Sequence, residues 1–146
     1  MDALRTGIYT FFTAAPGGVH NDFYTALNGR LFFGEAPEGT NLSDGPYGIF
    51  FFVSDTNNDV FAGQGKDVYV QFSLFSGDSS PAVILDMDKD LSTLYKDTSF
   101  AVTGWTVINM KRVQGNGPLN IPADTESGTG RYWMHTVDFE ISLHKT

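Results

Sequence analysis

The clearest pattern in the sequence is an alternation of apolar and polar residues between Asp67 and Ser76. The apolar positions recur at every second residue, at Val68, Val70, Phe72 and Leu74. Side chains two residues apart lie on the same face of an extended strand, so this spacing predicts one buried strand face. Gly65 and Gly77 lie just outside the run and favour its ending there. We therefore predict that this segment is the central strand of an antiparallel sheet.

Other segments also have the composition of strands, namely residues 30–33, 47–53, 100–113 and 132–144. The third of these is expected to bend at Gly104. Residues 47–53 are almost continuously apolar, which predicts that both faces of this strand are covered, one by helices and the other by a neighbour. Residues 132–144 alternate, with His135 on the apolar side of the strand.

Two segments have the apolar period of an amphipathic helix. The first is residues 2–14, where Gly7 weakens the helix by about 1 kcal/mol relative to alanine, so that packing must compensate. The second is residues 81–95, which Ser80 is placed to cap. Its predicted buried face consists of Ile84, Met87, Leu91 and Leu94.

The connecting segments are polar and rich in turn-forming residues. Residues 35–46 are predicted to form a surface loop, and residues 55–66 a hairpin connection or an extended arm. Residues 114–130 contain glycines and prolines without apolar periodicity, and predict a loop longer than a hairpin needs. The whole chain, residues 1–146, is thus predicted to be one α+β domain, with an antiparallel sheet of four to five strands and two α-helices packed on one face.

Composition narrows the classes of function. The formal net charge is −8 and the pI is near 4.5, which argues against a broad basic surface for nucleic acid or anionic membrane. The chain has no cysteine, so disulfides and thiolate chemistry are excluded. No apolar run is as long as a membrane span, and the amino terminus lacks the pattern of a secretory signal. We expect the chain to fold in a cytoplasm and to contact no membrane.

Acidic residues offer two candidate calcium loops, and both fail. Asp86, Asp88 and Asp90 alternate as calcium ligands do, but Leu91 stands where the loop needs glycine and the segment is predicted to be helical. We interpret these three acids as a solvated helix face. Residues 55–59 fail the same test, because Val60 occupies the glycine position.

The sequence contains no convincing catalytic set. The three histidines are too scattered to define a metal site, and His135 has the position of a core or interface histidine. A hydrolase pairing His135 with Asp138 is disfavoured, because residues three apart on a strand point to opposite faces. Residues 63–67 lack both the first glycine and the Ser or Thr of a phosphate-binding loop. We predict that the chain is not an enzyme and holds no metal or cofactor.

Short motifs occur along the whole chain in a defined order. They are Met1–Leu4, Gly29–Phe32, Ala36–Thr40, Pro46–Tyr47, Val70–Ser76, Thr103–Trp105, Met110–Arg112 and His135–Glu140. In this order and spacing the chain resembles the tail completion proteins of long-tailed bacteriophages, which are also called tail terminators or head–tail joining proteins.

The resemblance implies a structural virion protein of the tail or neck, assembled in the host cytoplasm. Such proteins form a homohexameric ring that caps the tail tube and joins it to the head completion or connector protein. DNA passes through the lumen of the ring without sequence-specific binding. The acidic charge of this chain suits a channel in which DNA slides without sticking.

On this hypothesis, the interface and lumen contacts come from the two polar connections. The candidates in the first are Asp55, Asn57, Asp59, Phe61 and Lys66. The candidates in the second are Asn116, Leu119, Ile121, Asp124 and Glu126. The alternative function is a small α+β ligand-binding or regulatory module that dimerises through its sheet.

Overall fold

A computed structural model describes residues 2–59, 63–122 and 131–146. The described helices are α1 (Asp2–Thr13), α2 (Asp22–Leu27) and α3 (Ala82–Tyr95), with 3-10 turns η1 (Pro16–Gly18) and η2 (Leu42–Asp44). The strands are β1 (Leu31–Phe33), β2 (Tyr47–Asn57), β3 (Gly65–Ser76), β4 (Trp105–Pro122) and β5 (Arg131–Lys145).

The five strands form one sheet in the order β1-β2-β3-β5-β4. The α+β class and the central position of β3 are therefore confirmed. The sheet is mixed rather than purely antiparallel, because the short β1 runs parallel to β2. The remaining neighbours pair antiparallel.

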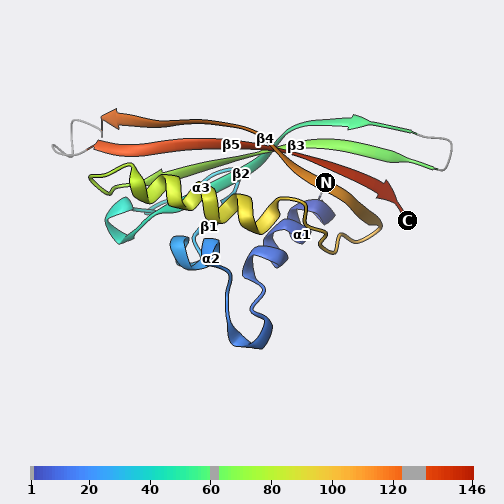
Figure 1. The fold of residues 1–146 in the computed structure, drawn as a ribbon, viewed down its shortest axis with the longest axis horizontal. Coiled ribbons are helices and arrows are strands. Elements are labelled where there is room, and N and C mark those ends of the chain that lie inside the picture. The colour runs from blue at the N-terminus through green and yellow to red at the C-terminus, as the bar shows by residue number, and fades with distance from the viewer. Residues whose placement is uncertain (1, 60–62, 123–130) are drawn as a thin grey trace.

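The helices lie in one layer on one face of the sheet (Figure 1). The hairpins β2–β3 and β4–β5 are longer than this layer, and their ends project in opposite directions (Figure 1). The opposite face of the sheet carries none of the described helices, and we call it the open face.

The core lies between the sheet and the helices. Phe72 in β3 is fully buried, and its ring centroid is 5.4 Å from that of Tyr95 and 5.7 Å from that of Phe139. The Tyr95 hydroxyl donates a hydrogen bond to the carbonyl oxygen of Ile8, which joins α3 to α1. The glycine within α1 has a packing reason, because a Cβ at Gly7 would lie 2.7 Å from the Ala101 carbonyl oxygen.

Three sequence predictions need correction. There is a third, six-residue helix, α2, which begins where the Asn21 side chain accepts a hydrogen bond from the Tyr24 N–H. The segment Phe100–Val102 is not part of β4, because only Val102 forms an isolated bridge, to Trp105. Residues 114–122 are not a loop, because β4 continues to Pro122 opposite Arg131.

Candidate functional site

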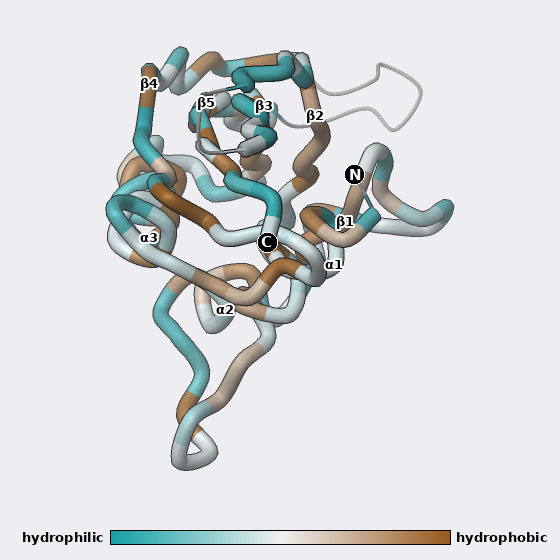
Figure 2. Tube along the Cα trace, turned by 90° about the vertical axis from the view of Figure 1, so that its right-hand side faces the viewer, coloured by the Kyte–Doolittle hydropathy of each residue, from teal (hydrophilic) through white to brown (hydrophobic). Residues whose placement is uncertain are grey.

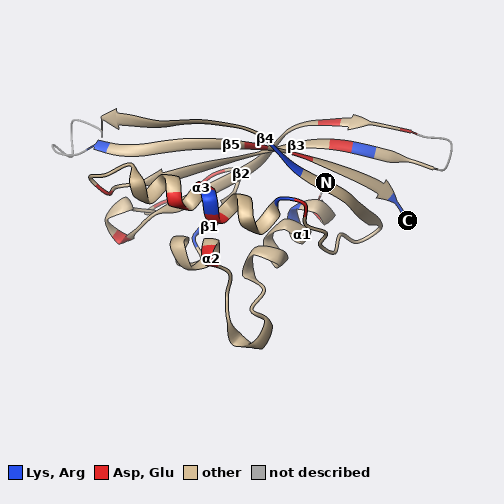
Figure 3. Cartoon of the chain, in the orientation of Figure 1, with Lys and Arg blue, Asp and Glu red and all other residues tan. Residues whose placement is uncertain are grey.

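The open face has two chemically different halves. In β2, β3 and β5 the residues of this face alternate with the core residues and are mostly half-buried. Towards the β4–β5 hairpin the exposed positions are apolar, whereas towards the β2–β3 hairpin they are polar. The charged residues of the two hairpins follow the same division: they gather on β2–β3, whereas the described β4–β5 end is nearly free of them (Figure 3).

The first half we call the apolar half. It consists of Tyr47, Ile49, Phe51, Phe75, Leu119, Ile121, Tyr132 and Met134. The Tyr47 and Phe75 rings stack with centroids 4.9 Å apart, and the Tyr132 ring lies 6.3 Å from that of Phe75. Leu119 is 58% exposed. The pKa of Tyr47 lies above its ordinary value. The main cause is partial burial, and the nearby Tyr132 is a smaller cause in the same direction.

The second half we call the polar half, and its side chains bond to one another across the strands. The Gln71 and Gln114 amides each donate to Asp138, both at 2.9 Å. The Tyr69 hydroxyl donates to Glu140 at 2.8 Å, and this hydrogen bond is the main reason that its pKa is raised. Further along, Asp67 accepts hydrogen bonds from Ser142 and Asn58. These polar groups thus form their hydrogen bonds within the chain, and they also remain accessible to water.

The structure separates the candidates of the two polar connections. Asp55 and Asn57 lie at the end of β2, Lys66 at the start of β3 and Asp59 in the connection, and Phe61 falls outside the described residues. The Lys66 ammonium is 3.1 Å from the Asp55 carboxylate. This group occupies the β2–β3 end of the sheet.

The candidates of the second connection lie at the opposite end of the sheet. Asn116, Leu119 and Ile121 are residues of β4 rather than of a loop, and Asp124 and Glu126 fall outside the described residues. Leu119 pairs with Met134, and Ile121 with Tyr132. Both apolar candidates therefore belong to the apolar half.

The single chain covers one face of residues 47–53, and the cover of the other face by a neighbour stays a prediction. Gly48 and Phe50 are buried on the helix side, whereas Ile49 and Phe51 are only half-buried on the open face. Val53 is 58% exposed at a bulge in the pairing of β2 with β3. The apolar composition that predicted a second cover thus lies at the surface.

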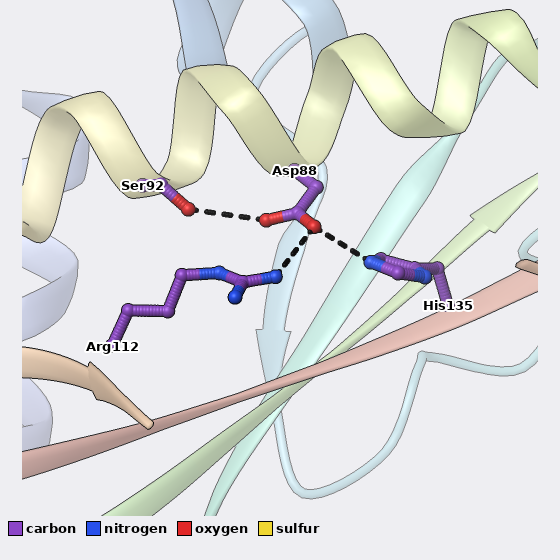
Figure 4. A network of polar contacts seen from close by, with 4 residues as sticks. All are labelled: Asp88, Ser92, Arg112 and His135. Atoms are coloured by element: carbon purple, nitrogen blue, oxygen red, sulfur yellow. Dashed lines mark hydrogen bonds and ion pairs between the residues drawn. The ribbon is translucent and has the colours of Figure 1, made fainter. Parts of the chain in front are cut away.

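A polar cluster lies beneath the sheet, between α3, β4 and β5 (Figure 4). The Asp88 carboxylate is 2.7 Å from His135 Nε2 and 2.9 Å from Arg112, and it accepts a hydrogen bond from Ser92 at 3.1 Å. Burial opposes ionisation of Asp88, but the His135 and Arg112 hydrogen bonds and the Arg112 charge outweigh it and lower its pKa to about 2.

The prediction that Asp88 lies on a solvated helix face is therefore wrong. Its side chain is only 14% exposed, because it lies one turn from both Ile84 and Leu91 on the covered side of α3. That spacing was the available signal in the sequence. His135 is buried as predicted, and its partner is Asp88 rather than Asp138, which lies on the open face.

The Asp88 cluster has the character of a structural ion pair. Its acid and its histidine are both largely enclosed, and no hydroxyl group is placed beside His135 as a nucleophile among the described side chains. Within residues 2–59, 63–122 and 131–146, no three His, Asp or Glu side chains gather as a metal site requires. In that same part of the chain, no helix is long and apolar enough to cross a membrane.

The fold is shared with a chain of known structure. A chain of the virion of the native gene transfer agent (GTA) particle superimposes with a TM-score of 0.70 at 11% sequence identity. The match covers 98% of this chain and 96% of that chain. No protein-family model and no curated protein sequence matches the chain. At this level of identity, the likeness establishes that the two chains share a fold along nearly their whole length.

Proposed function

We propose that this chain is a structural virion protein that forms a hexameric ring at the end of a tail tube and joins the tube to the head connector. The observation that carries the proposal is the fold shared over 98% of the chain with a virion component. The motif order described above supports the more specific role of tail terminator.

The open face supports an assembly role on physical grounds. The apolar side chains of this face are half-buried, and none of the described helices covers them. Covering them would gain about 25 cal/mol for each Å² removed from water. A contiguous exposed apolar patch is typical of protein interaction sites. We infer that the apolar half is covered by another protein of the assembled particle.

Both hairpin ends provide lumen or docking contacts in this proposal. At the β2–β3 end the contact residues would be Asp55, Asn57, Asp59 and Lys66, and at the β4–β5 end Asn116. Phe61, Asp124 and Glu126 fall outside the described residues and stay candidates from the sequence. The acidic excess of the chain suits a lumen through which DNA passes without being held.

The test is attachment to tail tubes. Purified protein, labelled at its carboxyl terminus with gold, is mixed with tubes of the particle that encodes it and viewed by electron microscopy. We expect label at one end of each tube, a halt in tube growth, and a native mass of six chains. A protein that labels tube sides, or leaves tube length unchanged, would not be a terminator.

The alternative is a regulatory module that dimerises through its sheet, and the exposed apolar half also favours it. The two functions differ in stoichiometry. A native mass of two chains, together with no binding to tubes, would favour the module.

A further inference from the structure

The sheet has two open edges on opposite flanks of the molecule. β4 forms one edge, and β1 with the outer part of β2 forms the other (Figure 2). Among the described strands, β1 pairs with residues 48–50 of β2, and residues 51–57 of β2 pair with β3 alone. An unpaired edge is a natural place for contact with another chain.

The β4 edge is apolar and basic. Its pairing with β5 shifts at Ile108 and again at Val113, and these two residues are 64% and 45% exposed. Residues 105–122 include Lys111 and Arg112 and no acidic residue. Arg112 is engaged by Asp88, whereas Lys111 is exposed.

The opposite flank is hollowed and acidic. A pocket of about 440 Å³ opens between α1 and β1, and Tyr9, Leu31 and Phe33 form much of its apolar wall. Tyr9 and Phe33 are 44% and 42% exposed. Arg5 and Glu35 both line the pocket, and Glu38 lies in the exposed loop after β1. The Arg5 guanidinium lies over the Phe33 ring and is 3.6 Å from the Asp2 carboxylate, so the two glutamates leave this flank with an acidic excess.

We propose that this flank receives the β4 edge of a second copy of the chain. Ile108 and Val113 would fill the apolar pocket, and Lys111 would face Glu35 and Glu38. The charges of the two edges are complementary, whereas joining two β4 edges would bring cation against cation.

The proposed contact is head-to-tail, because it uses two different edges. Such contacts repeat from copy to copy and close into a ring when the rotation between copies permits. Closure of the contacts into a ring rests on the proposed function. The contact between two edges does not depend on binding to a tail tube.

Disulfide cross-linking tests the contact, because the chain has no cysteine of its own. The variant with both Tyr9→Cys and Ile108→Cys is oxidised and run on a non-reducing gel. We expect a ladder of linked copies, formed at least about tenfold faster than in the control, because docking raises the effective concentration of the two thiols. The control carries Val19→Cys with Ile108→Cys, since Val19 is 71% exposed outside both edges. Equal rates in the two variants would overturn the proposal.

Charge reversal gives a second test, in which the rate of cross-linking is measured for charge variants of the double-cysteine protein. Lys111→Glu alone, or Glu35→Lys with Glu38→Lys, should slow the ladder to the control rate. Mixing the two charge variants should restore it, because each edge then meets an opposite charge. Charge variants that cross-link at the unaltered rate would contradict the contact.

The two proposals fail in different ways. A rapid ladder from protein that never binds tubes would retain the edge contact and remove the terminator function. Tubes capped by hexamers, with edges that cross-link no faster than the control, would retain the terminator function and remove the edge contact.

Discussion

The two halves of the open face are built on the same strands with the same alternation, yet their surfaces differ in hydrogen bonding and in apolar exposure. In the polar half, Asp138 is held by amides from both neighbouring strands. In the apolar half, Phe75 stacks on Tyr47 and leaves part of both rings exposed. The alternation of residues determines the face on which each side chain lies. The residue types along the strand determine whether that face is polar and hydrogen-bonded within the chain, or apolar and exposed as a contact surface.

The difference has an energetic meaning. Covering the polar half would remove water from Asp67, Asp138 and Glu140, and a buried carboxylate is costly unless its partner supplies new bonds. Covering the apolar half has no such cost. Of the two halves of the open face, the apolar half is therefore the one that we expect another protein to cover in the assembled state.

The largest expected effect comes from the covered side of the same strand. Phe72→Ala should lower the free energy of unfolding by about 3–5 kcal/mol, because it leaves a cavity among aromatic rings. Phe75→Ala, three residues along on the open face, should cost only about 1 kcal/mol. Denaturant melts measure both, and a loss under about 1 kcal/mol at Phe72 would mean that the two faces of β3 are reversed.

The next effect should appear in assembly rather than in folding. Phe75→Ala should weaken attachment to tail tubes by about 30-fold, corresponding to about 2 kcal/mol for the loss of a central aromatic contact. Gln71→Ala is the matched control, since Gln71 lies on the same strand and face within the polar half. Sedimentation of tubes with bound protein measures the affinities, and equal losses in the two variants would erase the distinction between the halves.

The covered cluster should make the stability of the fold depend on pH. The pKa of Asp88 in the folded chain is about 2, below the ordinary value of 3.8. Its contribution to stability, up to about 2 kcal/mol, is therefore present above pH ~4 and is lost as the pH falls through 2. Asp88→Asn should remove this part of the acid slope in melts between pH 5 and 2. An unchanged slope would show that other acids account for it.

The smallest effect should come from a polar-half residue at the sheet edge. Gln114→Ala removes one hydrogen bond to Asp138 from an exposed position. We expect a change in unfolding free energy within about 0.5 kcal/mol and unaltered tube binding. A loss of binding comparable with that of Phe75→Ala would extend the contact surface into the polar half.

The sequence predicts best those elements whose side chains pack on the core. The apolar residues of β3 and β5 recur at every second position because one face of each strand packs on the core, and the buried residues of α3 recur at helical spacing. β4 beyond Val113 escaped prediction because it is an edge strand with interrupted pairing, so its residues are largely exposed and lose the period of two. The helix α2 has only six residues, too few for a period to emerge.

The candidate site was only partly predictable for a related reason. Leu119 and Ile121 were chosen as contact residues, but their partners Met134 and Tyr132 depend on a register that the sequence does not reveal. The apolar half gathers residues from four strands that are distant in the chain. Asp88 shows the converse. An acid among the apolar residues of a helix is predicted to be solvated until the fold places Arg112 and His135 beside it.

The most direct test of the account is a cryo-electron microscopy structure of the tail-tube end with this protein attached. We predict six copies in a ring, with Phe75, Tyr132 and Leu119 in contact with another protein chain. The polar half around Asp138 should face solvent or the lumen. A ring of another stoichiometry, or one whose apolar half faces water, would contradict the central claim.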